Sequence, residues 1–289
     1  MNLLKITFLL IGLFSALLSA VCVQAKDFTF TAIPDQDTTH LEQRFGSVAA
    51  YLEAQLGVKV VYVPVKSYAA AVTAFTNNEV QLAWFGGLSG VQARMRVPGS
   101  EAIAQGYEDQ FFKTYFIAHE SAGLTKAERL PKELLGKTLT FGSKGSTSGR
   151  LMPEFYIREA FKKSPDEIFS RVGFSGDHSR TIALVNTGAY QVGVVNYKVW
   201  ESDLADGKVD PEKVTVIWET PAYPDYQWSI RGDADKIWGE GFSAKVKHAL
   251  INMNDPELLA NFPRQSFVEA KNADYQPILD TAKSIGLID

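Results

Sequence analysis

The sequence predicts an α/β protein that folds as two lobes, and three observations lead to this prediction. After residue 26, short apolar runs rich in β-forming residues alternate with segments in which apolar residues recur every three or four positions. This alternation occurs as two series, one before residue 106 and one after residue 136, and it is typical of parallel sheets with helices on both faces. Two strand-rich passages, at 112–119 and 221–231, are where the chain is expected to cross between the lobes.

The first series supplies the elements of the first lobe. Strands are expected at 28–33, 58–63, 80–85 and 102–105, and helices at 41–56, 67–75 and 86–95. The first of these helices ends before Gly57, a typical stop signal. Its apolar residues follow one helical face: Leu41, Phe45, Val48, Ala49, Leu52 and Leu56.

The second series builds the second lobe, and the chain then returns to the first. Strands are expected at 137–141, 172–174, 192–195 and 214–218, with helices at 151–161 and 181–186. Three further helices, at 242–253, 256–262 and 274–285, are expected to rejoin the first lobe. The predicted divisions are therefore 26–115 for the first part of lobe 1, 116–222 for lobe 2, and 223–289 for the return crossing and the rest of lobe 1.

The N-terminus predicts export. Lys5 is followed by an apolar run from 6 to 23 and by Val-Gln-Ala at 23–25, which together resemble a signal peptide cleaved after Ala25. A membrane anchor is the alternative, because 18 uncharged residues are just long enough to cross a bilayer. A lipoprotein anchored at Cys22 is less favoured, because bulky Val21 stands where a small residue is wanted. We therefore expect residues 1–25 to be removed and the mature protein to be periplasmic.

Composition excludes several classes of function. The net charge of −4 gives no sign of a nucleic-acid binder. Cleavage after Ala25 removes the only cysteine, and the four histidines lack the spacing of a metal site. No metal and no cofactor are therefore expected.

The strongest candidate for chemistry is the segment Gly-Ser-Lys-Gly-Ser-Thr-Ser-Gly at 142–149, which follows a strand and opens a helix. The unpaired N–H groups of a first helical turn favour an anion, and Ser146, Thr147 and Ser148 add three hydroxyl donors. A plain helix cap is the alternative, although one serine would satisfy it. The segment therefore predicts a site for a tetrahedral oxyanion.

Three other loops lie where a strand meets a helix or crosses between lobes, which is where ligands bind in open α/β sheets. Trp84, Phe85 and Gly86 end a strand, and on their own they are better explained by core packing followed by a loop. His178 opens a helix and can donate to an anion, or belong to an ordinary cap. Asp225 follows a proline and suits a turn, yet it can also accept a hydrogen bond from the O–H of an acidic ligand.

Enzyme motifs are incomplete. The segment 145–149 has Thr147 where a nucleophile elbow needs serine, and Pro131 stands where a phosphate-binding P-loop needs its first glycine. His119-Glu120 lacks the second histidine of a zinc protease helix. A hydrolase of phosphate esters therefore lacks a nucleophile–base pair, and a binding protein is expected.

These loops, in this order, resemble the periplasmic phosphonate-binding protein family of ABC transporters. The resemblance covers residues 28 to 289 and is carried by Trp-Phe-Gly-Gly-Leu-Ser at 84–89, Ser-Thr-Ser-Gly at 146–149, His178 and Asp225. Four further stretches look like the phosphite-binding branch: Ala-Ile-Pro-Asp-Gln at 32–36, Val-Lys-Ser-Tyr-Ala at 65–69, Gln-Gly-Tyr-Glu-Asp-Gln at 105–110, and Gly-Phe-Ser-Gly-Asp-His-Ser-Arg at 173–180.

The resemblance implies a class II periplasmic binding fold whose two lobes close over the ligand. It implies that Tyr68 hydrogen-bonds the ligand, that Ser146, Thr147 and Ser148 cradle its oxygens, that His178 donates to it and that Asp225 accepts from it. Relatives that bind aminoalkylphosphonates place an acidic residue where this chain has Asn196 and Tyr197, which puts an amine-bearing ligand in doubt. The aromatic rings of Trp84, Phe85, Tyr68 and Tyr197 are expected to narrow the cavity.

The resemblance thus implies a monomeric receptor that captures phosphite and delivers it to an ABC permease in the inner membrane. Methylphosphonate and hypophosphite stay open as alternative ligands, and phosphate is the hardest competitor to exclude. Arsenite is disfavoured, because the branch that binds it uses cysteine. A sensory module that signals to a membrane histidine kinase is the alternative from another class, because its fold and site would be the same.

Overall fold

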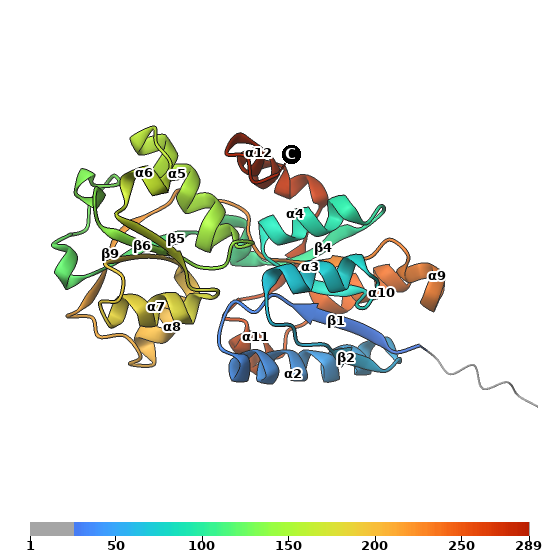
Figure 1. The fold of residues 1–289 in the computed structure, drawn as a ribbon. Helices are drawn as coiled ribbons and strands as arrows, with labels where there is room; N and C mark the ends of the chain where they lie inside the picture. The colour runs from blue at the N-terminus through green and yellow to red at the C-terminus, as the bar shows by residue number, and fades with distance from the viewer. Residues whose placement is uncertain (1–25, 289) are drawn as a thin grey trace, which may run out of the picture.

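The computed structural model describes residues 26–288, so the predicted signal peptide and Cys22 lie outside the described residues. Figure 1 shows two lobes, each containing one sheet. The first sheet has the strand order β11-β4-β10-β3-β1-β2, and the second has the order β7-β6-β8-β5-β9. The prediction of a two-lobed α/β fold is confirmed.

The first sheet is mixed, because a strand from the end of the chain is inserted into it. Its strands are β1 (Phe28–Ala32), β2 (Val60–Tyr62), β3 (Leu82–Phe85), β4 (Glu101–Gly106), β10 (Gln227–Ile230) and β11 (Phe267–Glu269). β1 pairs in parallel with β2 and β3, whereas β10 lies antiparallel between β3 and β4. The first series thus forms a mixed sheet, within the predicted α/β fold of mixed or parallel sheets, and β4 pairs only with antiparallel neighbours.

Helices cover both sides of the first sheet. They are α2 (Thr38–Leu56), α3 (Tyr68–Thr76), α4 (Gly87–Arg96), α9 (Ala234–Trp238), α10 (Phe242–Ile251), α11 (Pro256–Asn261) and α12 (Gln276–Ser284). α2 contacts α10 and α11, while α4 contacts α3 and α12, and Figure 1 shows the two groups on opposite sides. α2 begins after the cap residue Asp37 and ends at Gly57, whose positive φ of 70° suits glycine.

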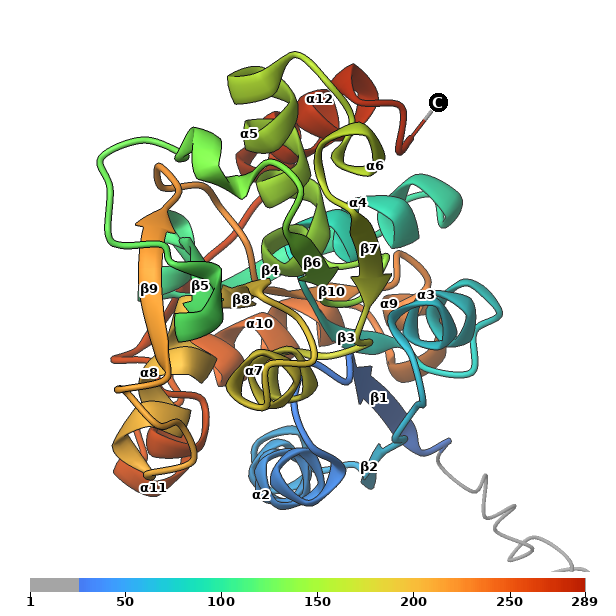
Figure 2. The ribbon, with the colours of Figure 1, turned by 60° about the vertical axis from the view of Figure 1, so that its left-hand side comes forward.

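The second sheet has a separate apolar core on each face. Its strands are β5 (Thr114–His119), β6 (Thr138–Phe141), β7 (Arg171–Phe174), β8 (Val192–Asn196) and β9 (Val214–Glu219), and its helices are α5 (Met152–Phe161), α6 (Pro165–Ile168), α7 (His178–Asn186) and α8 (Tyr197–Ala205). One core contains Ile157 of α5 and Ile168 of α6, and the other contains Ile182 of α7 and Trp200 of α8. Figure 2 shows the strands of this sheet side by side.

Two crossings join the lobes, and they are paired with each other. One runs from β4 through the short turn η2 (Tyr107–Phe111) to β5, and the other runs from β9 to β10. Phe112 and Tyr223 exchange two backbone hydrogen bonds of 2.9 and 3.0 Å between them. Most of the predicted passage at 112–119 is β5 itself, inside the second sheet, so the first crossing lies earlier in the chain than expected. The predicted lobe boundaries stay predictions.

Most other elements lie within a few residues of the expected ranges, but α6, α8, α9 and β11 were not expected as elements.

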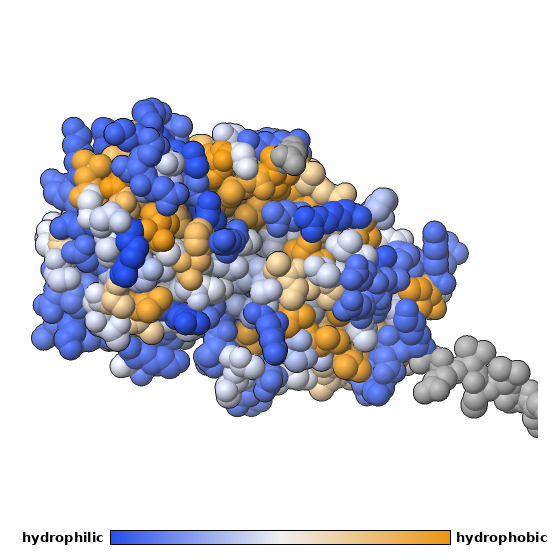
Figure 3. Space-filling view, in the orientation of Figure 1, coloured by the Kyte–Doolittle hydropathy of each residue, from blue (hydrophilic) through white to orange (hydrophobic). Residues whose placement is uncertain are grey.

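No helix in residues 26–288 is both long and apolar enough to cross a membrane. Figure 3 shows hydrophilic side chains over most of the visible surface of both lobes, with apolar residues in small groups. The remaining short turns are η3 (Glu120–Ala122), η4 (Lys132–Leu134), η5 (Thr147–Leu151) and η6 (Asn272–Tyr275).

Candidate functional site

Five predicted site residues come from segments that meet where the two lobes face each other. Tyr68 opens α3 and Gly86 precedes α4 in the first lobe, while Thr147 opens η5 and His178 opens α7 in the second. Asp225 lies in the second crossing, just before β10. The contacts described below bring these segments together around the three hydroxyl residues of η5.

Ser146, Thr147 and Ser148 are buried, with exposed fractions of 1–2%. The Ser146 hydroxyl accepts a hydrogen bond from the Gly149 N–H at 2.9 Å, so it caps the turn in the way the alternative interpretation expected. The Thr147 hydroxyl accepts from the Leu88 N–H at 3.0 Å, which joins the second lobe to the start of α4 in the first. One hydroxyl is thus used for the cap, one for the lobe contact, and Ser148 extends toward His178.

Asp225 is a buried carboxylate with one occupied and one open oxygen. Its Oδ1 accepts from the Gly87 N–H at 2.8 Å, whereas its Oδ2 has no hydrogen-bond partner. Burial raises the pKa of Asp225 to about 7, although the Gly87 N–H and the hydroxyls of Thr147 and Ser148 favour the charged form. Gly86 permits this approach, because a Cβ there would lie 3.1 Å from Asp225 Oδ1.

His178 is a neutral hydrogen-bond donor in this environment. Burial lowers the pKa of its imidazole to about 4, with the nearby Asp35 carboxylate opposing. Its Nδ1 accepts from the Asn196 backbone N–H at 3.2 Å, so the proton of the neutral ring belongs on Nε2. Nε2 lies 3.4 Å from the Ser148 hydroxyl, a long contact that leaves its N–H free for a better acceptor.

Tyr68 adds a third group without a good partner. Its hydroxyl is buried and makes no hydrogen bond of good geometry, although it lies close enough to Ser146 to interact with it. Burial raises the pKa of Tyr68 well above its ordinary value, so it remains a neutral O–H donor. Gly145 packs directly against this residue, since a Cβ there would lie 3.1 Å from Tyr68 Cβ. A groove of about 450 Å³ between α3 and the 142–145 loop reaches Tyr68 from solvent.

The three consecutive hydroxyl residues therefore lie beside three other predicted site residues: Tyr68, Asp225 and His178. Ser146 is beside Tyr68, Thr147 is beside Asp225, and Ser148 is beside both Asp225 and His178. The arrangement combines several neutral donors with one carboxylate oxygen that can only accept when ionised. A small oxyanion that keeps one acidic O–H matches this set.

The other predicted residues occupy different places. Trp84 stacks on Tyr226 in the aromatic core, with ring centroids 5.5 Å apart, and Phe85 packs edge-on against Phe75 on the other face of β3. Tyr197 is half-buried against Phe112, with ring centroids 4.9 Å apart. These contacts place the three rings against other aromatic side chains.

Asn196 is engaged by protein groups. Its Oδ1 accepts from the Lys198 and Val199 N–H groups at the start of α8, and its Nδ2 donates to the Tyr226 hydroxyl at 3.0 Å. Its backbone N–H orients His178. Asn196 thus lies behind the site rather than presenting a free amide to it.

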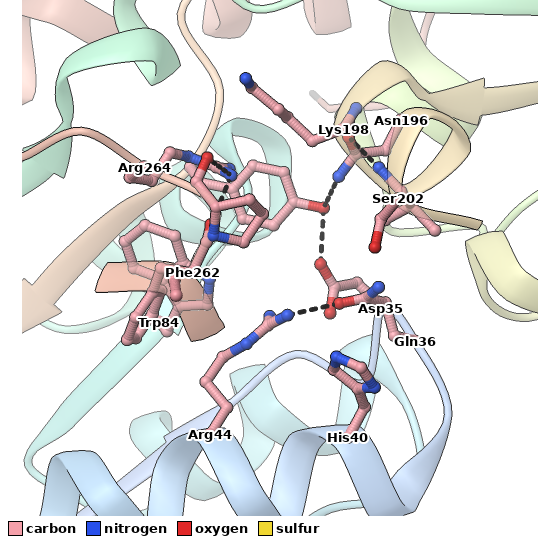
Figure 4. A pocket seen from close by; sticks show the side chains of 14 residues that line it. Asp35, Gln36, His40, Arg44, Trp84, Asn196, Lys198, Ser202, Phe262 and Arg264 are labelled. Carbon is pink, nitrogen blue, oxygen red and sulfur yellow. Dashed lines mark hydrogen bonds between the residues drawn. The ribbon is translucent and has the colours of Figure 1, made fainter. Parts of the chain in front are cut away.

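A second polar cluster at the lobe boundary was missed by sequence reasoning. Asp35, Arg44 and Tyr226 line a cavity of about 60 Å³ together with Asn196 and Arg264. Figure 4 shows Arg44 and His40 reaching into it from α2, and Asp35 from the loop after β1. The sequence did offer one indication of this cluster. The stretch 32–36, which contains Asp35, resembles the phosphite-binding branch, but no role was assigned to it.

Within residues 26–288, no three side chains among His, Cys, Asp and Glu are arranged to hold a metal ion. The site described above combines one histidine and one carboxylate with several hydroxyls, and these groups can bind a ligand through hydrogen bonds.

Comparison with known proteins identifies the family. The family model for the periplasmic substrate-binding protein of phosphonate ABC transporters matches residues 30–275. The chain is 38% identical over 283 residues to the "Probable ABC transporter phosphite binding protein PhnD1" of Prochlorococcus marinus, covering 96% of this chain and 95% of that protein. It is 27% identical to the phosphonates-binding periplasmic protein of Escherichia coli, over 79% of this chain and 65% of that protein.

Solved structures agree with this match. The structure of Prochlorococcus marinus PhnD1 in complex with methylphosphonate superimposes with a TM-score of 0.87 at 38% identity, covering 91% of this chain and 99% of that one. A phosphonate-transporter binding protein from Pseudomonas aeruginosa has a TM-score of 0.78 at 19% identity, covering 89% and 86%, and supports the fold alone. This chain belongs to the family of periplasmic phosphonate-binding proteins, the substrate-binding components of ABC transporters.

Proposed function

We propose that this chain captures phosphite, as an anion that retains one P–O–H group, in the cleft between its lobes. The observation that supports this proposal is the pairing of opposite hydrogen-bonding roles. The Nε2–H of His178 and the hydroxyls beside it donate to the charged oxygens of the ligand, while Asp225 Oδ2 accepts from its acidic O–H. Without a ligand proton, the Asp225 carboxylate would repel the anion.

The surroundings favour a ligand that has no amine. A ligand ammonium group needs a buried acceptor, preferably a free carboxylate. Asn196 uses its oxygen to cap α8, and the nearby Asp35 carboxylate already accepts from Tyr226 and lies beside the charge of Arg44. The similarity to a protein named for phosphite binding, and to its complex with methylphosphonate, supports a small phosphorus oxyanion.

Calorimetry of the mature chain with phosphite, methylphosphonate, 2-aminoethylphosphonate and phosphate tests this proposal. We expect phosphite to bind most tightly and 2-aminoethylphosphonate most weakly. Phosphate is expected to bind less tightly than phosphite, because its additional oxygen must lose its hydration and find a partner in the same site. Tightest binding of the aminoalkyl compound would contradict the proposal, and tightest binding of methylphosphonate would move the ligand to an alkylphosphonate.

We also propose that the protein is a periplasmic monomer, released by cleavage after Ala25, that serves phosphorus uptake through an ABC permease. Mass spectrometry of the exported protein tests the cleavage, and a mass that includes an acyl group on Cys22 would contradict it. Growth on phosphite as sole phosphorus source, with and without the gene, tests the role in uptake. Unchanged growth together with altered gene expression would favour the sensory alternative.

A further inference from the structure

Three buried side chains form a hydrogen-bonded chain across the boundary between the lobes. Asn196, at the end of β8 in the second lobe, donates from Nδ2 to the Tyr226 hydroxyl at 3.0 Å. That hydroxyl donates to Asp35 Oδ2 at 2.8 Å, in the first lobe. All three side chains are 2–3% exposed. In Figure 4 the two bonds run in sequence from Asn196 through the tyrosine oxygen to Asp35.

The direction of this chain is determined by chemistry. Asn196 Oδ1 faces the two N–H groups that open α8, so Nδ2 must be the atom facing Tyr226. The tyrosine hydroxyl has one proton, and the Asp35 carboxylate is its acceptor, so its lone pairs remain for Asn196. Each group thus has one role, and the chain cannot reverse without leaving a buried polar atom unpaired.

Both ends of the chain are also bound to His178. The Asn196 N–H donates to His178 Nδ1 at 3.2 Å, which places the imidazole proton on Nε2. The His178 backbone N–H donates to the Asp35 carbonyl at 2.9 Å, across the lobes. His178 is therefore held from the second lobe through its ring and from the first lobe through its backbone.

We propose that Asn196, Tyr226 and Asp35 form a closure latch, which assembles when the lobes close and holds His178 as a donor to the bound oxyanion. The three residues act as positioning residues: they retain the ligand without contacting it. This inference rests on the proposed oxyanion ligand. Binding proteins of this architecture open and close about their crossings, and the Asn196–Tyr226 bond joins residues on opposite sides of that movement.

Arg44 supports the Asp35 end of the latch. Its side chain is 5% exposed and donates from Nη2 to Gln36 Oε1 at 2.6 Å, within the same cavity as Asp35. Burial lowers the pKa of Arg44, and the nearby Asp35 carboxylate opposes that shift. Asp35 Oδ1 and Arg44 Nε have no direct partners, and the cavity between them has room for water molecules to bridge them.

The latch predicts an effect on ligand release rather than on capture. Capture occurs in the open protein, in which the latch is not made, whereas release requires the latch to break. Stopped-flow fluorescence with phosphite as the probe therefore measures both rate constants for wild type, Tyr226→Phe, Asn196→Ser and the double variant. Phenylalanine keeps the ring that stacks on Trp84, and serine keeps a capping oxygen for α8 without the amide that reaches Tyr226.

We expect each single variant to raise koff about tenfold with kon nearly unchanged, which corresponds to about 1.4 kcal/mol for one lost hydrogen bond. The double variant is expected to release phosphite little faster than either single variant, because each single variant already removes the Asn196–Tyr226 bond, which is the bond of this chain that joins the lobes. Tyr51→Phe is the matched control, since its hydroxyl donates to the Ala249 carbonyl at 2.7 Å within the first lobe. We expect its rates to equal those of wild type.

The outcomes separate the latch from the proposed ligand. Unchanged koff in Tyr226→Phe and Asn196→Ser, or effects that multiply in the double variant, would overturn the latch while leaving the ligand in place. A wild-type protein that binds neither phosphite nor methylphosphonate would overturn the proposed function and the latch with it. If one single variant does not fold, the other still decides, because a tenfold change in koff alone supports the latch and no change contradicts it.

Discussion

Two buried aspartates, one in each crossing region, have the same burial and opposite surroundings. Asp109 in η2 and Asp225 before β10 are both at most 1% exposed, and the Asp225 N–H donates to the Asp109 carbonyl at 2.9 Å. Asp109 accepts from Arg264 Nε and Nη2 at 2.9 and 2.7 Å, and from the Gly106 N–H at 3.0 Å. Asp225 accepts from the Gly87 N–H at 2.8 Å and lies beside the hydroxyls of Thr147 and Ser148, with no cation paired to it.

The difference separates a carboxylate that is paired with a cation from one that we propose binds the ligand. A buried charge is tolerable where it is paired and hydrogen-bonded, as Asp109 is by Arg264. An unpaired buried carboxylate destabilises the folded state and persists where something outside the chain uses it. The Asp109–Arg264 pair joins the first crossing to the C-terminal part of the first lobe, whereas Oδ2 of Asp225 has no hydrogen-bond partner.

Removing the paired cation should cause the largest loss of stability. We expect Arg264→Met to lower the free energy of unfolding by about 3–5 kcal/mol, because Asp109 would be left as an uncompensated buried charge. Urea denaturation of the ligand-free protein measures this. The control is Lys162→Met, which breaks an exposed pair with Glu159 and should change stability by less than about 1 kcal/mol. Equal effects of the two substitutions would contradict the structural role of Arg264.

Neutralising the unpaired carboxylate should affect binding and stability in opposite directions. We expect Asp225→Asn to weaken phosphite binding about 10- to 100-fold, because a charged acceptor for the ligand O–H is lost. The ligand-free protein should become more stable at pH 8, on the order of 1 kcal/mol, because a buried charge is removed. Calorimetry and urea denaturation measure the two effects. Asp210→Asn, on the surface of the second lobe, should leave binding unchanged, and loss of stability without loss of affinity would remove Asp225 from the site.

The pH dependence of stability should distinguish Asp225 from His178. The folded-state pKa of Asp225, about 7, lies above the ordinary value of 3.8. The contribution of Asp225 to the free energy of unfolding therefore falls as pH rises from about 4 to 7. The folded-state pKa of His178, about 4, lies below its ordinary value of 6.5. The contribution of His178 to the free energy of unfolding is therefore lost as pH falls from about 6.5 to 4.

Urea unfolding curves of the ligand-free variants between pH 4 and 7 measure how the free energy of unfolding changes with pH when each group is removed. The stability advantage of Asp225→Asn over wild type should grow between pH 4 and 7 and then level. Relative to His178→Gln, wild type should gain stability as pH rises from 4 to 6.5. Parallel pH profiles of the two variants would show that neither group titrates as its surroundings indicate.

The smallest expected effect is that of Tyr68→Phe. Its hydroxyl has no good partner in the ligand-free structure, so its removal should not lower stability. Phosphite affinity should fall about 2- to 10-fold, because one neutral hydrogen bond to the ligand is lost. Calorimetry beside the Tyr51→Phe control measures this change. An unchanged affinity would place Tyr68 outside the ligand's reach.

The order of strands and helices, and the loops that follow them, could be predicted from local pattern. Periodicity predicted α2 and most strands, and the glycines and hydroxyls at 142–149 predicted an oxyanion site at the start of η5. The resemblance of the four loops identified the family. The side-chain roles of Tyr68, Ser146, Thr147, Ser148, His178 and Asp225 stay predictions, although the structure brings these residues together.

The tertiary structure alone decided which polar groups are free and which are satisfied. Tyr226 and Asp35 bond across 191 positions of sequence, and both polar atoms of the Asn196 amide are occupied by bonds to Tyr226 and to the start of α8. The insertion of β10 between β3 and β4 places Asp225 beside Gly87, 138 positions away. Sequence pattern reports neighbours along a strand or helix, whereas hydrogen-bond saturation depends on groups that only the folded chain brings into contact.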